Sequence, residues 1–312
     1  MAIRRVFAIG IPIAMVAIAI GAISQKRVHK SVHVSVRHAA KVRPAAPVPP
    51  PPMGGSFVSL TQIEDDEIAS TGFSLSQPYD VRVYAVGEGM SNQMYDYGWI
   101  LNAETRQPVW KMEYRDTHRA GGASKNRMVN DVITLDPGKY LVYYMTDGSH
   151  SWDDWNSAAP SHENAWGITL LAAEGEADES VIGRYDISND ESIIAQLVAI
   201  RDDDSRRQAF TLEDETTVRI YALGEGDRSE MYDYAWIEDA DTRRDIWEMT
   251  YRKTDHAGGA QKNRLFDGTI VLPAGEYYLR YESDGSHSLE DWNSTPPRDP
   301  FSYGVTLYRV GN

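Results

Sequence analysis

The chain has 312 residues, a net charge of −15, and an aromatic content that favours 18 Tyr and eight Trp over six Phe. This length suits about two domains of roughly 100–200 residues each. The absence of Cys excludes disulfides, thiolate nucleophiles and Cys-type zinc sites. Residues 1–56 hold eight Lys or Arg and no acid, which leaves 23 basic and 46 acidic groups and a net charge of −23 on the remaining body. Such a body repels nucleic acid and suits divalent cations.

The N-terminal segment has the pattern of a membrane anchor or an export signal. A short basic start, Met1–Arg5, precedes 18 uncharged residues at 6–23, which is near the lower limit for a helix that spans a membrane. We therefore expect residues 1–25 to form an apolar helix, either an uncleaved signal anchor or a cleaved signal peptide. Residues 26–56 form a basic and Pro-rich linker, which includes VRPAAPVPPPPMGG at 42–55.

These segments predict a body that is anchored in the inner membrane and faces the periplasm, or a secreted protein. A spacer that holds the body away from the bilayer fits export, as does a basic start followed by an apolar run. The Lys and Arg residues that follow the apolar run would by themselves place the body in the cytoplasm, so that orientation stays open.

The body of the chain is one sequence written twice. Residue i aligns with residue i+137 without a gap, and 48 of the 98 positions in 73–170 are identical to their partners in 210–307. MYDYGWI at 94–100 matches MYDYAWI at 231–237, for example. A gapless period of this length indicates a duplicated domain, because solenoid repeats run to about 20–50 residues. We expect repeat 1 at 57–180, a connector at 181–193 and repeat 2 at 194–312.

Within each copy the hydrophobic period is two, which is typical of strands. In TVRIYAL (217–223), apolar and polar residues alternate, and TIVLPAGEYYLRYE (269–282) has the pattern of a hairpin with a Pro-Ala-Gly turn. Turn residues recur every ten residues or so, and neither body contains an apolar pattern of helical length. The predicted fold is all-β: two tandem, homologous, antiparallel β-sandwich domains of jelly-roll type.

Three segments of repeat 2 resemble the bacterial pre-peptidase C-terminal modules that are appended to exported proteins: FTLEDETTVRIYAL (210–223), ADTRRDIW (240–247) and IVLPAGEYYLRY (270–281). The resemblance covers the strand skeleton of each repeat and implies non-catalytic accessory modules. It does not extend to YDYAWI, to TDHAGGAQKNR (254–264) or to DGSHSLEDWN.

The loops DGSHSWDDWN (147–156) and DGSHSLEDWN (284–293) carry the candidate site. Their carboxylate and amide oxygens suit a hard cation such as Ca²⁺, and their Trp offers a stacking face to a sugar ring. The structural alternative is that Asp and Asn bond to the loop backbone while Trp closes the end of the sandwich. The candidate ligand or metal residues are Asp147, His150, Asp154, Trp155, Asn156, Asp284, His287, Asp291, Trp292 and Asn293.

Two further patterns each allow a structural and a functional interpretation. A zinc site through His256 would face Arg119 in the other copy, and Arg does not bind metals, so a shared histidine site is disfavoured. The stripe Tyr232, Tyr234 and Trp236 shares one face of a strand, where core packing is the default and an exposed platform for glycan is the alternative.

No catalytic motif is present: the sequence lacks G-x-S-x-G, H-E-x-x-H and S-x-x-K with its companions. We therefore expect a non-catalytic binding or adhesion module of the cell envelope, tethered to the membrane, with glycan, peptidoglycan or an envelope protein as partner and calcium as a possible aid. The alternatives are a glycan or ester hydrolase that uses Asp, Glu and His of the repeated loops, and a purely structural spacer. No nucleic-acid partner is expected.

Overall fold

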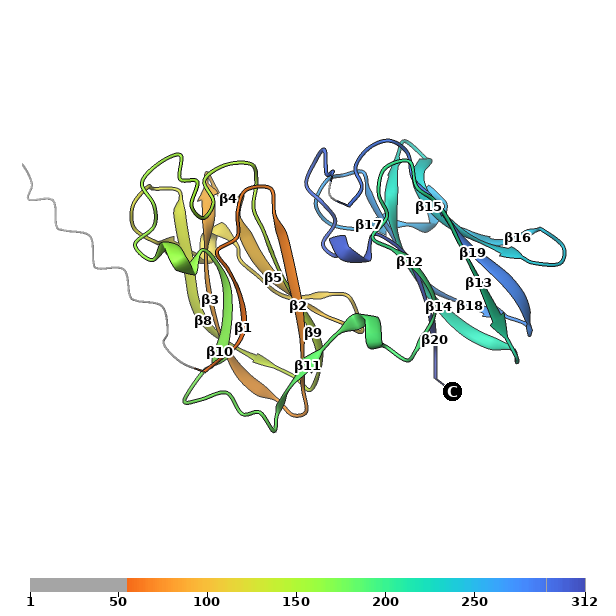
Figure 1. Cartoon of the computed structure of the whole chain (residues 1–312), viewed down its shortest axis with the longest axis horizontal. Helices are drawn as coiled ribbons and strands as arrows, with labels where there is room; N and C mark the ends of the chain where they lie inside the picture. The colour runs from red at the N-terminus through yellow and green to blue at the C-terminus, as the bar shows by residue number, and fades with distance from the viewer. Residues whose placement is uncertain (1–54, 290, 312) are drawn as a thin grey trace, which may run out of the picture. The chain divides into compact units, whose positions relative to one another are not determined.

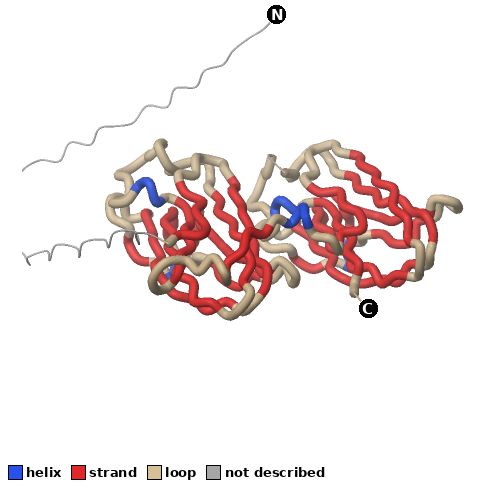
Figure 2. Tube along the Cα trace, turned by 60° about the horizontal axis from the view of Figure 1, so that its bottom comes forward, coloured by secondary structure: helices blue, strands red, loops and turns tan. Residues whose placement is uncertain are grey.

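The computed structural model describes residues 55–289 and 291–311, which belong to one compact unit. The all-β prediction is confirmed, since the described residues fold into antiparallel β-sandwiches in tandem. Helical structure in this part of the chain is limited to five single 3₁₀ turns. Figure 2 shows the strands in red and these short turns in blue.

Repeat 1 consists of two antiparallel sheets that face each other (Figure 1). The first sheet has, in spatial order, β1 (Ser56–Thr61), β10 (Gly167–Ala172), β3 (Tyr79–Met90), β8 (Asn126–Leu135) and β7 (His118–Arg119), with β4 (Gln93–Met94) paired to β3. The second sheet has β11 (Ile182–Tyr185), β2 (Ile68–Leu75), β9 (Gly138–Met145), β5 (Tyr97–Asn102) and β6 (Pro108–Lys111). The predicted connector therefore contributes β11, which pairs with β2 at the edge of repeat 1.

Repeat 2 builds the same two sheets from equivalent strands. One contains β12 (Ile193–Val198), β20 (Gly304–Arg309), β14 (Thr216–Asp227), β18 (Asn263–Leu272) and β17 (Asp255–His256). The other contains β13 (Ser205–Leu212), β19 (Gly275–Glu282), β15 (Glu230–Asp239) and β16 (Asp245–Glu248). The β14–β15 hairpin links the two sheets into one continuous ladder.

Each repeat has its own hydrophobic core between its sheets. Alternate residues of the long central strands point inward, such as Val81 and Val83 in β3 and Val218 and Ile220 in β14, all fully buried. Two separate clusters result, one within repeat 1 and one within repeat 2. The period of two in the sequence therefore corresponds to burial on one face of each strand.

The predicted hairpin at 269–282 is wrong. β18 pairs with β14, whereas β19 pairs with β13 and β15, so the chain crosses from one sheet to the other at this point. The crossing lets Leu272 and Tyr277 both enter the core, and the Tyr277 hydroxyl donates a hydrogen bond to the Pro273 carbonyl at 2.9 Å. Tyr140 makes the same bond to Asp136 in repeat 1. The tyrosine thus fixes a corner that local sequence alone cannot distinguish from a turn.

Core packing, the default interpretation of the Tyr-Trp stripe, is also wrong for repeat 2. The inward positions of β15 are the alternate ones, since Asp233, Ala235 and Ile237 are fully buried. Trp236 lies on the outer face of the sheet and is half-buried. Its counterpart Trp99 occupies the same face in repeat 1 but is only 4% exposed.

Contacts with repeat 2 explain the burial of this outer face in repeat 1. The indole nitrogen of Trp99 donates a hydrogen bond to the Arg298 carbonyl at 2.8 Å. Arg106 forms an ion pair with Asp299 at 2.6 Å, and both side chains are buried. The Tyr143 hydroxyl donates a hydrogen bond to the same carboxylate. The outer face of this sheet therefore forms an interface in repeat 1 but not in repeat 2.

The predicted signal anchor or signal peptide and almost all of the Pro-rich linker fall on residues 1–54, which lie outside the described residues, so both stay predictions. Among the residues that the structure describes, no helix has the length and hydropathy needed to span a membrane.

Candidate functional site

A triad of carboxylates lies at one end of each sandwich. In repeat 1 it consists of Glu88, Asp96 and Asp147, and each offers an oxygen within 4.8 Å of the others. Glu88 is near the end of β3 in the first sheet, while Asp96 directly precedes β5 and Asp147 closely follows β9 in the second. Because β5 and β9 are antiparallel neighbours, the start of one lies beside the end of the other. The fold therefore brings carboxylates from both sheets to one point.

Repeat 2 contains the same triad. Glu225, Asp233 and Asp284 also offer oxygens within 4.8 Å of one another. Each is the partner, 137 residues later, of a triad residue in repeat 1. Glu225 lies in β14, Asp233 in β15, and Asp284 after β19. The site is thus a property of the duplicated domain.

Close backbone approach makes this convergence possible. Gly87 precedes Glu88, and a Cβ on Gly87 would lie 2.1 Å from the carbonyl oxygen of Asp96. Gly224 has the same relation to Asp233, again at 2.1 Å. Any larger residue would push the two strands apart, so Gly is required at both positions for the carboxylates to meet.

Several oxygens of the triads are buried without a hydrogen-bond partner among the described residues. In repeat 1 these are Oε2 of Glu88 and Oδ2 of Asp96, and in repeat 2 Oε2 of Glu225. Asp96 is fully buried, and Glu88 and Glu225 are only 6% and 5% exposed. A buried polar atom without a partner is costly, so these oxygens are positions where a bound ion or water would be stabilising.

One lysine partly balances each triad. Nζ of Lys125 lies 3.0 Å from Oε1 of Glu88, and Nζ of Lys262 lies 2.9 Å from Oε1 of Glu225. With all three carboxylates ionised, each triad and its ammonium group would together carry two negative charges. A divalent cation would neutralise that charge.

Burial raises the pKa of the buried triad acids. The pKa of Asp96 is raised to about 9, mainly by burial, and the charges of Asp147 and Glu88 add to the shift. The pKa of Asp233 is raised less, to about 7, again by burial. Burial also raises the pKa of Glu88, although its hydrogen bond to Lys125 opposes that shift. An acid in this state gives up its proton readily when a cation binds beside it.

A single substitution next to the triad contributes to the smaller pKa shift of Asp233. The Tyr303 hydroxyl donates a hydrogen bond to Oδ2 of Asp233 at 2.6 Å and lowers the pKa of that carboxyl. The equivalent residue in repeat 1 is Trp166, whose indole nitrogen has no partner among the described residues. Oδ2 of Asp96 is therefore free for a ligand, whereas Oδ2 of Asp233 is shared with a hydroxyl.

The repeated loops contribute one residue each to the triads, Asp147 and Asp284. The backbone N–H groups of these residues donate 2.8 Å hydrogen bonds to Asp96 and Asp233. Their own Oδ1 atoms accept hydrogen bonds from the backbone of Ser149 and Ser286, respectively. The loop thus holds Asp147 beside Asp96, and Asp284 beside Asp233.

The two candidate histidines are enclosed in the loop. His150 and His287 are fully buried, and their Nε2 atoms lie 2.6 and 2.5 Å from Oδ1 of Asn126 and Asn263. The amide nitrogen of each Asn donates to two backbone carbonyls, so the Asn oxygen faces the imidazole and Nε2–H is the donor. Burial lowers the pKa of each His to about 4. Both imidazoles are therefore neutral at pH 7 and have Nε2 engaged.

The remaining predicted residues are spread around the loop. Trp155 packs edge-on against His150 and Trp166, and Trp292 packs in the same way against His287 and Tyr303. Asn156 and Asn293 each accept a hydrogen bond from the lysine of their triad at 2.7 Å. Asp154 and Asp291 are exposed, and the backbone N–H of each donates to a Ser carbonyl in the same loop.

Sequence reasoning missed Glu88, Asp96, Glu225 and Asp233. The signal was present in EGMSNQMYD (88–96) and EGDRSEMYD (225–233), where a Glu and an Asp eight residues apart are retained although most residues between them differ. Asp96 also falls between two tyrosines, on the inward face of its strand pattern, where an acid is unusual. The neighbouring aromatic residues led to a prediction of core packing or glycan stacking for this strand, and not of a carboxylate site.

The donor set is suited to calcium. Each triad offers only oxygen atoms, and Ca²⁺ takes six to eight oxygen ligands in flexible geometry. Zinc prefers nitrogen and sulfur, and the nearby imidazoles are engaged elsewhere.

No protein-family model matches the chain, and no curated protein matches it either. The resemblance to pre-peptidase C-terminal modules therefore stays a prediction. Among solved structures, the chain is similar to the CUB1-EGF-CUB2 domain of human MASP-1/3, at 10% identity and a TM-score of 0.25, over 82% of this chain and 99% of that one. The CUB1-EGF-CUB2 domains of rat MASP-1 are similar at 10% identity and a TM-score of 0.24, over 81% of this chain and 96% of that one. At these values the assignment of the fold rests on the strand pairing of the chain itself.

Proposed function

We propose that this protein is a non-catalytic binding or adhesion module of the cell envelope, and that each of its two β-sandwich repeats binds one calcium ion. The observation that carries the calcium part is the duplicated carboxylate triad with its buried, unpartnered oxygens. A cation there would join Glu88 of one sheet to Asp96 and Asp147 of the other. It would thereby order the loop that begins at Asp147.

Calcium titration of the purified protein tests this proposal directly. We expect two sites by calorimetry and a rise in melting temperature, because a ligand that binds only the folded state stabilises it by about 2.7 kcal/mol at 100 times Kd. Asp96→Asn and Asp233→Asn should each remove one site. Asp154→Asn and Asp214→Asn, at exposed acids outside the triads, should keep both sites. An unchanged melting temperature in calcium, or equal losses in the exposed-acid variants, would contradict the proposal.

The binding part rests on the layout of the chain. Two homologous modules on one Pro-rich spacer can engage a repeating polymer at two points, which raises avidity without stronger single contacts. We propose glycan, peptidoglycan or an envelope protein as the partner, with calcium ordering the binding ends. The protein should co-sediment with isolated cell-wall polymer in calcium and be released by a chelator. A purely structural spacer would not sediment in either condition.

The geometry does not favour the hydrolase alternative. A general base must reach its substrate, yet His150 and His287 are fully buried and donate Nε2–H to Asn. Asp154, an exposed acid of the loop, forms no ion pair with another described residue. A chromogenic glycoside and ester panel should therefore show no turnover.

We place the body outside the cytoplasm, held by the N-terminal segment. Protease added to intact spheroplasts should digest the body, whereas a cytoplasmic control protein should survive. Protection of the body until the membrane is lysed would reverse this orientation.

A further inference from the structure

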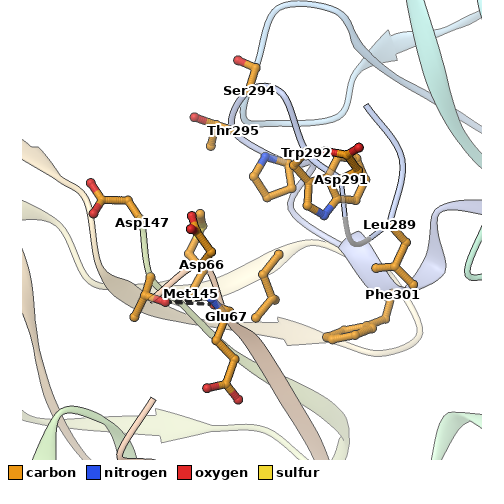
Figure 3. A pocket seen from close by; sticks show the side chains of 13 residues that line it. Asp66, Glu67, Met145, Asp147, Leu289, Asp291, Trp292, Ser294, Thr295 and Phe301 are labelled. Carbon is orange, nitrogen blue, oxygen red and sulfur yellow. Dashed lines mark hydrogen bonds between the residues drawn. The ribbon is translucent and has the colours of Figure 1, made fainter. Parts of the chain in front are cut away.

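A groove of about 640 Å³ lies where the loop end of repeat 1 meets repeat 2 (Figure 3). This volume falls within the roughly 300–1,000 Å³ typical of small-molecule sites. Figure 3 shows Asp66, Glu67 and Asp147 on one side and Asp291 and Trp292 on the other. The groove therefore draws residues from both copies of the domain.

The charges that line this groove are all negative. Four carboxylates contribute, from Asp66, Glu67, Asp147 and Asp291, and no Lys, Arg or His is among the lining residues. None of the four forms an ion pair with another described residue. Asp66, Glu67 and Asp291 are also exposed, so ligands can reach them. A cationic ligand would complement these charges, and a hydrogen bond between an ammonium and a carboxylate is stronger than a neutral one.

The groove also has a substantial apolar lining. Ile68 and Met145 come from repeat 1, and Leu289, Trp292 and Phe301 come from repeat 2. Phe301 is 37% exposed and stacks on Tyr143 at 6.3 Å between ring centroids. A metal ion or a free ammonium ion would leave this lining unused. A ring-shaped body with polar edges would use both the apolar and the carboxylate parts.

We propose that this groove binds an amino sugar with a free amine, as part of an oligosaccharide of about two rings. The ring faces would pack on the apolar side chains, the hydroxyls would donate to the carboxylates, and the ammonium would lie between Asp66 and Asp291. This assignment deepens the proposed envelope function by naming the ligand class, and it rests on that function. If calcium occupies the triad and engages Asp147, the carboxylates of Asp66 and Asp291 stay available.

The test uses the full chain in saturating calcium and the β-1,4-linked glucosamine disaccharide as probe, measured by calorimetry or NMR. We expect binding of the free-amine disaccharide to exceed that of its N,N′-diacetyl form and of cellobiose by about tenfold, the value of one charge-assisted contact. Equal binding of all three would overturn the amine assignment. Spermidine distinguishes an amino sugar from a simple polyamine as the ligand. Binding of spermidine as tight as that of the disaccharide, through the same carboxylates, would overturn the sugar assignment.

Matched variants locate the site. Asp66→Asn and Asp291→Asn should each weaken disaccharide binding about fivefold to tenfold. Asp203→Asn and Asp154→Asn, their equivalents in the other repeat, lie outside the groove and should leave binding unchanged. Equal effects of both pairs would overturn the proposal. Calcium titrated alone reports on the triads, so a failure of the groove and a failure of the calcium proposal are distinguishable.

Discussion

The two repeats share 48 of 98 aligned residues, yet the same outer face has opposite roles in them. In repeat 1 it is apolar: Leu101 and Tyr143 are buried, and the Tyr143 hydroxyl donates a hydrogen bond to Asp299 of repeat 2. In repeat 2 the equivalents are Glu238 and Arg280, which form an ion pair at 2.8 Å. The divergence of these positions shows how a duplicated domain becomes a tandem pair: one copy becomes an interface and the other stays polar.

An arginine that occupies the equivalent position in both repeats shows the same contrast. Arg106 is 3% exposed and donates to Asp299, Ser302 and Tyr308 of repeat 2. Its equivalent Arg243 is 58% exposed and pairs with Glu238 within its own repeat. The surroundings therefore decide whether the same side chain at the same position joins the two repeats.

The largest expected effect comes from breaking the buried pair. Arg106→Ala leaves the Asp299 carboxylate buried without its cation, which we expect to cost about 3–5 kcal/mol of unfolding free energy. Arg243→Ala is the matched control and should change stability little, because an exposed ion pair contributes little. Urea unfolding of both variants measures the contrast. Similar losses would show that the repeats are not joined as described.

The second prediction uses the difference between the triads in pKa. At pH 8, calcium binding should release about nine-tenths of a proton at the Asp96 site, whose pKa is about 9. The Asp233 site, with a pKa of about 7, should release only about a tenth of a proton. Calorimetry in buffers of different ionisation enthalpy, with Asp233→Asn and Asp96→Asn isolating each site, measures both values. Equal proton release would remove the distinction between the sites.

The same shifts set the stability of the calcium-free protein. Both carboxyls bind their protons more tightly in the folded state than at the unfolded Asp pKa of about 3.9, so their contribution to stability is complete below that pH. It is lost as pH rises towards about 7 for Asp233 and about 9 for Asp96. The calcium-free melting temperature should therefore fall across this window, and saturating calcium should oppose the fall. A rise in calcium-free stability with pH, from 5 to 9, is the opposing result.

A smaller effect is expected from the residue that distinguishes the triads. Tyr303→Phe removes the hydroxyl that donates to Asp233, so the pKa of that carboxyl should rise towards that of Asp96. We expect a loss of about 1 kcal/mol in stability, the value of one buried hydrogen bond. Proton release on calcium binding at pH 8 should increase in this variant. Unchanged release would show that the hydroxyl does not set the difference.

The smallest expected effect is at the corners between the sheets. Tyr277→Phe and Tyr140→Phe each remove one hydrogen bond to a backbone carbonyl and should cost about 0.5–1.5 kcal/mol. Calcium affinity should not change, because neither hydroxyl contacts a triad. Similar losses in both variants would support equivalent corners, whereas a loss in one alone would show that the corners have diverged.

Local sequence patterns were enough to predict the fold class and the duplication. Alternating residues such as Val218 and Ile220 indicated which face of each strand is buried. The constant offset of 137 related the strands of repeat 1 that precede the connector to those of repeat 2. Local patterns do this well because burial of one face of a strand imposes a period of two. The repeated loop also led to Asp147 and Asp284, one member of each triad.

Only the tertiary structure decided the rest, because the decisive contacts join residues that are distant in the chain. Asp96 and Asp147 meet because β5 and β9 pair, and Glu88 joins them from the opposite sheet. The path of the chain after Leu272 depended on which strand β19 pairs with. The burial of Trp99 depended on contact with a residue about 200 positions away in the chain. Strand alternation shows which side chains share a face, whereas long-range pairing determines what that face meets.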